Sequence, residues 1–170
     1  MRTTAATIVA APIETVWNVV SNPDRALSFL SGITRWEVES ETPTGLGARY
    51  RMLLRIGSAE VGGLIEIVEW EPPRELAWTS ITGVDQRGRW RLRPASAGRT
   101  RAEIRLAAGV AGSGIPGWVA ERIAQPIVGA HLRTSVRQLS RLVEHERLRD
   151  QATQRRAARA ARASGREAAG

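Results

Sequence analysis

The chain has 170 residues, enough for one domain with a sizeable core, and its 42% hydrophobic and 25% charged residues are typical of globular proteins. The absence of cysteine and the presence of only two histidines exclude disulfides, thiolate zinc sites and multi-histidine metal sites, so we expect no metal and no cofactor. Residues 1–146 contain 18 of the 25 arginines and 15 acidic residues, whereas residues 147–170 contain seven arginines and two acidic residues. The net charge of +8 therefore lies mainly at the C-terminus.

The first 30 residues predict one strand and two short helices. Residues 2–10 alternate weakly in polarity and favour a strand. Pro12 suits the first turn of a helix and Glu14 suits its positive end, which predicts a first helix to about Val20. A second short helix is expected over 23–30. The first strand begins without a separate apolar signal region, so we expect a cytoplasmic protein.

From Thr34 the hydrophobic period becomes two and continues for about 75 residues. This pattern, with short connections, predicts six antiparallel strands with one dry and one solvated face. Gly62-Gly63 inside one of these strands indicates a bulge or a sharp bend.

A long helix is expected from about Pro116 to Leu148, with an apolar stripe and a kink or interruption at Pro126. The segment before it, 109–114, is rich in small residues and predicts a flexible, lid-like loop. We therefore divide the chain into a domain of residues 1–147 and an Arg/Ala-rich tail of residues 148–170. The tail lacks large apolar residues after Leu148, and we expect frayed helix or disorder there.

Three segments carry a family resemblance. They are Ala-Pro-Ile-Glu-Thr-Val-Trp at 11–17, Asn-Pro-Asp at 22–24, and Glu-Trp-Glu-Pro-Pro-Arg-Glu-Leu-Ala-Trp at 69–78. In this order, the chain resembles the START-like superfamily, also called SRPBCC, and within it the bacterial polyketide cyclase/dehydrase and lipid-transport group. The resemblance covers about residues 2–145. It implies an α+β helix-grip fold: a seven-stranded curved antiparallel sheet around a long C-terminal helix, with two short helices between strands 1 and 2.

The resemblance also implies a ligand cavity between the concave face of the sheet and the long helix. Combined with the alternation of the strands, it gives a set of inward-facing, ligand-binding candidates. They are Tyr50, Met52, Leu54, Trp78, Trp90, Leu92, Ile104, Val119, Ile123, Ile127 and His131. An apolar wall with a few polar groups suits an oily ligand.

Several candidates have two interpretations. The aromatic rings at Tyr50, Trp78 and Trp90 either line a cavity or form ordinary core. His131 is either a general base or polar anchor of the pocket, or a structural residue. Glu66 is either a pocket acid or a residue of the outer face. His145 is expected in solvent.

The arginines also have two interpretations. An alternating series over 87–93, with more arginines on the next strand, forms either a basic patch or a solvated face with cross-strand ion pairs, and we favour the second. No nucleic-acid-binding motif occurs, so nucleic acid is not an expected partner. The tail has the charge to contact an anionic membrane surface but no Trp, Phe or Leu beyond Leu148 to insert stably.

Three functions remain open at this point. The first is binding or transport of a hydrophobic small molecule, lipid or polyketide-like. The second is a cyclase or dehydratase without metal or cofactor, in which His131, Tyr50 or Glu66 moves protons. The third is a regulatory or toxin-like interaction protein acting through the tail. The sequence shows no paired acid and base, which favours the first, and the catalytic residues of the second stay unknown.

Overall fold

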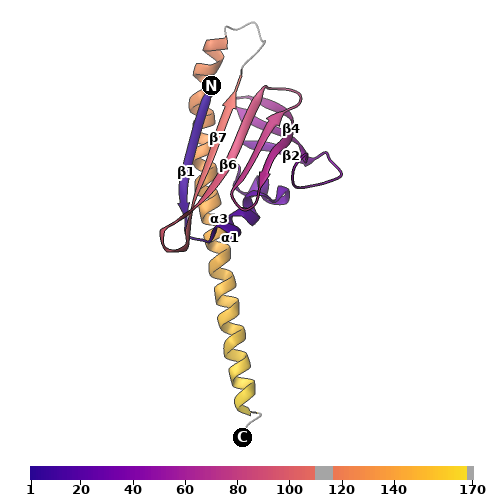
Figure 1. Cartoon of the computed structure of the whole chain (residues 1–170). Helices are drawn as coiled ribbons and strands as arrows, with labels where there is room; N and C mark the ends of the chain where they lie inside the picture. Colours follow the sequence, from indigo (N-terminus) through magenta and orange to yellow (C-terminus); the bar gives the residue numbers. More distant parts are fainter. Residues whose placement is uncertain (110–116, 168–170) are drawn as a thin grey trace.

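A computed structural model describes the backbone of residues 1–109 and 117–167, and the side chains of residues 1–109 and 124–159 (Figure 1). The elements follow in chain order: β1 (Arg2–Val9), α1 (Ile13–Val20), the 3₁₀ turn η1 (Pro23–Arg25), α2 (Ala26–Phe29), β2 (Ile33–Val38), β3 (Arg49–Ile56), β4 (Ala59–Glu71), β5 (Glu75–Ser80), β6 (Gln86–Ala95), the 3₁₀ turn η2 (Ser96–Gly98), β7 (Arg99–Ala108) and α3 (Gly117–Glu167). The predicted helix-grip order is confirmed.

All seven strands belong to one antiparallel sheet in the order β1-β7-β6-β5-β4-β3-β2. Neighbours in the chain are neighbours in the sheet from β2 to β7, while β1 pairs with β7 and places Ala5 opposite Ile104. Along β7, buried Ala102, Ile104 and Leu106 alternate with outward residues, as the period of two predicts. One face of the sheet is therefore available to form a core with the helices.

The glycine pair Gly62–Gly63 has a different role from the predicted bulge. The pairing of β3 with β4 runs through both glycines without a shift, and the irregularity in β4 lies between Ile67 and Glu69. A Cβ atom at Gly63 would lie 2.0 Å from the carbonyl oxygen of Thr82, at the connection between β5 and β6. The absence of a side chain thus allows two backbones to approach closely.

Helix α3 lies along the sheet and packs against β1, β7 and β3 as well as against α1 and α2 (Figure 1). Its buried stripe is the predicted one: Val128, Leu132, Val136, Leu139 and Val143. The helix continues through Pro126 without interruption. Of the predicted lid-like loop, residues 110–114 lie outside the described part of the chain.

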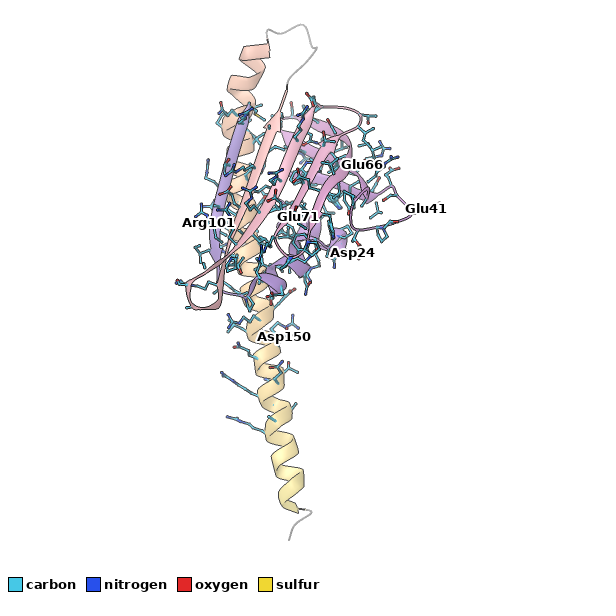
Figure 2. All side chains as sticks on the ribbon, in the orientation of Figure 1. Asp24, Glu41, Glu66, Glu71, Arg101 and Asp150 are labelled. Carbon is cyan, nitrogen blue, oxygen red and sulfur yellow. The ribbon has the colours of Figure 1, made fainter. Side chains whose placement is uncertain are left out.

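Beyond the sheet, α3 continues as a projecting segment (Figure 1). The last polar side-chain interactions of α3 with the rest of the described chain are an ion pair between Glu146 and Arg25 and a hydrogen bond from the Arg147 guanidinium to the carbonyl oxygen of Ala10. Leu148 is 64% exposed, and Figure 2 shows Asp150 on the projecting segment. The described part of the tail is helical as far as Glu167.

Candidate ligand-binding cavity

A cavity lies between the inward face of the sheet and the helices. The space between the atoms of its walls, including the part open to solvent, is about 860 Å³. Strands β2 to β7 supply one wall, the region from the end of α1 through α2 supplies another, and α3 supplies Val128, His131, Leu132 and Ser135. The described lining contains no Asp, Glu or Arg, so the cavity is mainly apolar with a few polar groups.

Aromatic rings define much of this wall. Trp36 and Tyr50 on adjacent strands stack with their ring centroids 5.0 Å apart, and Phe29 of α2 meets Trp90 edge-on at 6.0 Å. Such ring pairs hold one another in fixed orientations and therefore give the wall a defined shape.

The ring of Trp78 is placed by a glycine on the neighbouring strand. Trp78 of β5 is paired with Gly88 of β6, and a Cβ atom at Gly88 would lie 1.9 Å from Cζ2 of Trp78. The indole therefore occupies the space over Gly88 that any other residue type would fill.

Tyr50 is 3% exposed, and its hydroxyl donates a hydrogen bond of 2.8 Å to the carbonyl oxygen of Pro43. Burial disfavours the tyrosinate and raises the pKa of Tyr50 from 10.0 to about 12. Tyr50 is therefore a neutral hydrogen-bond donor at physiological pH, and its proton is directed to the protein's own backbone.

A polar corner joins α3 to the segment after α2. The Ser31 hydroxyl lies 3.1 Å from Nδ1 of His131, and the Ser31 main-chain N–H donates to Oγ of Ser135 at 2.9 Å. The Ser135 hydroxyl in turn donates to the carbonyl oxygen of His131 at 2.9 Å. A Cβ atom at Gly32 would lie 2.6 Å from the imidazole, so a glycine is required for the ring to pack here.

Gln86 is another polar residue of the lining, at the start of β6. It is 5% exposed, and its main-chain N–H donates to the Ser80 hydroxyl at 3.0 Å, which fixes the strand at this point. The buried indole Nε1 atoms of Trp36 and Trp78, both residues of the cavity wall, have no hydrogen-bond partner among the described residues.

The predicted ligand-binding residues fall into three groups. Seven contribute to the lining: Tyr50, Met52, Leu54, Trp78, Trp90, Ile104 and His131. Leu92 is buried in the core outside the cavity, and Ile127 is half-buried and also outside the lining. The side chains of Val119 and Ile123 lie outside the described residues.

The structure adds lining residues that sequence reasoning missed. Gln86 lies two and four residues before Gly88 and Trp90 on β6, so its side chain points to the same face of the sheet. The alternation of that strand could therefore have predicted Gln86 as an inward-facing residue. Phe29 and Ser31 come from the short helical region, where no strand alternation indicates which side chains face inward.

Glu66 is not a cavity acid. Its carboxylate accepts a hydrogen bond of 2.7 Å from Nε of Arg49 on the neighbouring strand, and the residue does not contribute to the lining. The interpretation of Glu66 as an outer-face residue is the one that the structure supports.

Arg89 and Arg91 of β6 form cross-strand ion pairs on the outer face, as the favoured interpretation predicts, and Arg101 and Arg105 pair with Glu103 within β7 itself. Glu75 binds Arg91 at 2.8 Å and Arg89 at 2.8 Å, and Glu103 binds both Arg101 and Arg105. The hydrogen bond from Arg91 lowers the pKa of Glu75. Much of the positive charge of this face is thus balanced locally.

The described residues contain no cluster of three or more side chains of the types that hold a metal ion. None of the helices, over the part of the chain that the structure describes, is long and apolar enough to cross a membrane.

The fold and the cavity together define a helix-grip protein with an apolar cavity between the sheet and the helices. The chain belongs to the family described as polyketide cyclase/dehydrase and lipid transport, whose sequence model matches residues 1–144. No curated protein matches the chain.

Similar solved structures share this fold at low sequence identity. The protein TTHA0849 of Thermus thermophilus has a TM-score of 0.75 and 19% identity, with 86% of this chain and 99% of that chain covered. The Zhui aromatase/cyclase of Streptomyces sp. R1128 has a TM-score of 0.72 and 18% identity, with 85% and 93% covered. A START superfamily protein of Mycobacterium smegmatis has a TM-score of 0.66 and 17% identity, with 85% and 97% covered.

Proposed function

We propose that this protein binds a hydrophobic small molecule, a lipid or a polyketide-like compound, in the cavity between sheet and α3 and carries or sequesters it. The observation that carries this proposal is the described lining, which is apolar and aromatic and has no Asp, Glu or Arg. Moving apolar ligand surface from water into such a site is favourable by about 25 cal/mol per Å².

The family gives independent support for this class of ligand. Its description joins lipid transport with polyketide cyclisation, and both activities handle mainly apolar molecules. One structure with the same fold is an aromatase/cyclase. Because that protein is only 18% identical, it supports the kind of ligand rather than a shared reaction.

Cyclase or dehydratase chemistry is the second candidate, and the contact between Ser31 and His131 is the observation that favours it. The Tyr50 hydroxyl already donates to the carbonyl oxygen of Pro43 and Glu66 lies outside the lining, which favours His131 as the proton-transfer group among the three candidates. If the protein is an enzyme, His131→Ala abolishes turnover and leaves ligand affinity within a few-fold. Equal loss of both would contradict a catalytic role for His131.

The experiment that tests the binding proposal is native mass spectrometry of protein purified from its own host, followed by organic extraction. Two variants on one strand serve as matched proteins: Leu106→Trp fills the cavity, and Arg105→Trp adds the same side chain to the outer face. We expect the natural protein and the Arg105→Trp variant to carry a bound hydrophobic molecule, and the Leu106→Trp variant to carry none. An adduct retained on Leu106→Trp, or no adduct on the natural protein in repeated preparations, would contradict the proposal.

A further inference from the structure

Three polar side chains are buried in the described part of the chain: Gln86, Thr100 and Ser135. The Thr100 hydroxyl donates to the carbonyl oxygen of Ala11 at 2.8 Å, and the Ser135 hydroxyl donates to that of His131 at 2.9 Å. The side-chain amide of Gln86 has no hydrogen-bond partner among the described residues, although the residue is only 5% exposed. The amide atoms of Gln86 are not among the fully buried polar atoms that lack a partner, so they keep accessible surface while the residue contributes to the cavity lining.

Gln86 lies on the cavity side of β6. On β6 it shares the inward face with Gly88 and Trp90, and it contributes to the cavity lining. Its backbone is fixed through the Ser80 hydroxyl, so the side chain is held at the cavity by a regular strand. A ligand in the cavity is thus the group that can pair with this amide.

A second donor lies on the same face of the sheet. Trp78 is paired with Gly88, two residues along β6 from Gln86, and residues in such diagonal positions are within reach of long side chains. The Nε1–H of Trp78 is buried and has no partner among the described residues, and the same is true of Trp36. The three wall residues whose side chains lack a partner within the described part of the chain, Gln86, Trp78 and Trp36, together hold more hydrogen-bond donors than acceptors, since an indole only donates and an amide carries two N–H groups and one oxygen.

We propose that Gln86 is the polar anchor of the cavity and that the ligand is an uncharged, mainly apolar molecule with carbonyl oxygens that accept hydrogen bonds from it. This rests on the proposed function, because it names the class of molecule that the same cavity binds. A plain hydrocarbon leaves the amide unpaired. A carboxylate brings a charge into a wall whose described residues include no Arg to balance it.

The test uses the full chain and three tricyclic compounds of the same shape: anthracene, anthraquinone and anthracene carboxylate. Quenching of tryptophan fluorescence reports binding, because four of the six tryptophans line the cavity. We expect anthraquinone to bind about tenfold more tightly than anthracene, and the carboxylate to bind more weakly than anthraquinone. Equal affinity for anthracene and anthraquinone, or tightest binding of the carboxylate, would overturn the inference and leave the proposed function standing. Binding of none of the three would overturn the proposed function itself.

Two glutamine variants locate the anchor. Gln86→Leu should reduce the preference for anthraquinone over anthracene to about twofold or less while leaving anthracene affinity intact. Gln138→Leu makes the same change on an exposed position of α3 and should keep the full preference. Because Gln86 has no protein partner, the unliganded Gln86→Leu protein should melt no lower than the natural one. A preserved preference, or an equal loss of affinity for both compounds with a lower melting temperature, would show that Gln86 is structural.

Discussion

Raising the pH tests whether the aromatic wall of the cavity is closed to water, because Tyr50 is the only tyrosine of the chain. Its pKa is about 12 in the folded protein against 10.0 for an open phenol. Below pH 10 the phenol is protonated in both states, and the free energy of unfolding is unaffected. Between pH 10 and 12 the unfolded chain releases the proton first, so stability falls as pH rises. Two pKa units correspond to a loss of about 2.7 kcal/mol once the pH exceeds 12.

The assay is ultraviolet absorbance of the tyrosinate, followed against pH in the folded protein and again in concentrated denaturant. We expect a midpoint near 12 in the first titration and near 10 in the second. Tyr50→Phe is the control, since it removes the signal altogether. A folded-state midpoint near 10 would contradict the burial of Tyr50, because it would mean that water reaches the phenol.

Three further predictions concern packing, charge and the tail. Gly88→Ala should lower the free energy of unfolding by about 1–3 kcal/mol, because the new methyl group overlaps the ring of Trp78; an unchanged urea midpoint would contradict this packing. Glu75→Gln should lower the free energy of unfolding by about 1 kcal/mol at neutral pH, because it removes the negative charge that pairs with Arg91. Since the folded-state pKa of Glu75 is lowered, its contribution is present above the ordinary value of 4.5 and lost as pH falls below it, so the two urea curves should converge in acid. Deleting residues 149–170 should change stability by no more than about 0.5 kcal/mol and weaken binding to anionic vesicles at low salt, and unchanged vesicle binding would rule out a membrane role for the tail.

The fold could be predicted because alternation and helix starts agree along the chain. The inward residues Ala102, Ile104 and Leu106 alternate with outward residues on β7, which fixes the strand and its facing side together. The role of Gly62–Gly63 could not be predicted, since glycine marks both bulges and close backbone approaches, and only the position of Thr82 distinguishes them.

The helix extends further than the apolar pattern predicts. The tail has no large apolar residue after Leu148, which argues against a buried segment but not against helical backbone. Alanine and arginine both have high helix propensity, and they continue the turn of α3 into solvent.

The candidate site could be predicted where strand parity decides the direction of a side chain. Trp90 and Ile104 are examples, and both line the cavity. The alternation of a strand shows which side chains face inward but not which of them reach the cavity. Leu92 therefore faces inward and is buried in the core, yet it lies outside the cavity. On α3 the side chains of Ile127 and Val128 point about 100° apart around the helix axis, and only Val128 reaches the lining. The sequence carries apolar residues at both positions, so periodicity alone does not decide which of the two faces the cavity.

We expect hydrophobic molecules to bind inside the cavity rather than on the surface of the protein. The most direct measurement is the affinity of the uncharged dye Nile red for the natural protein and for Leu106→Trp and Arg105→Trp, each verified as folded by circular dichroism. We predict saturable binding to the natural protein and to Arg105→Trp, and an affinity at least about tenfold weaker for Leu106→Trp, because the added ring occupies the space of the ligand. Equal affinity of all three proteins would contradict the account.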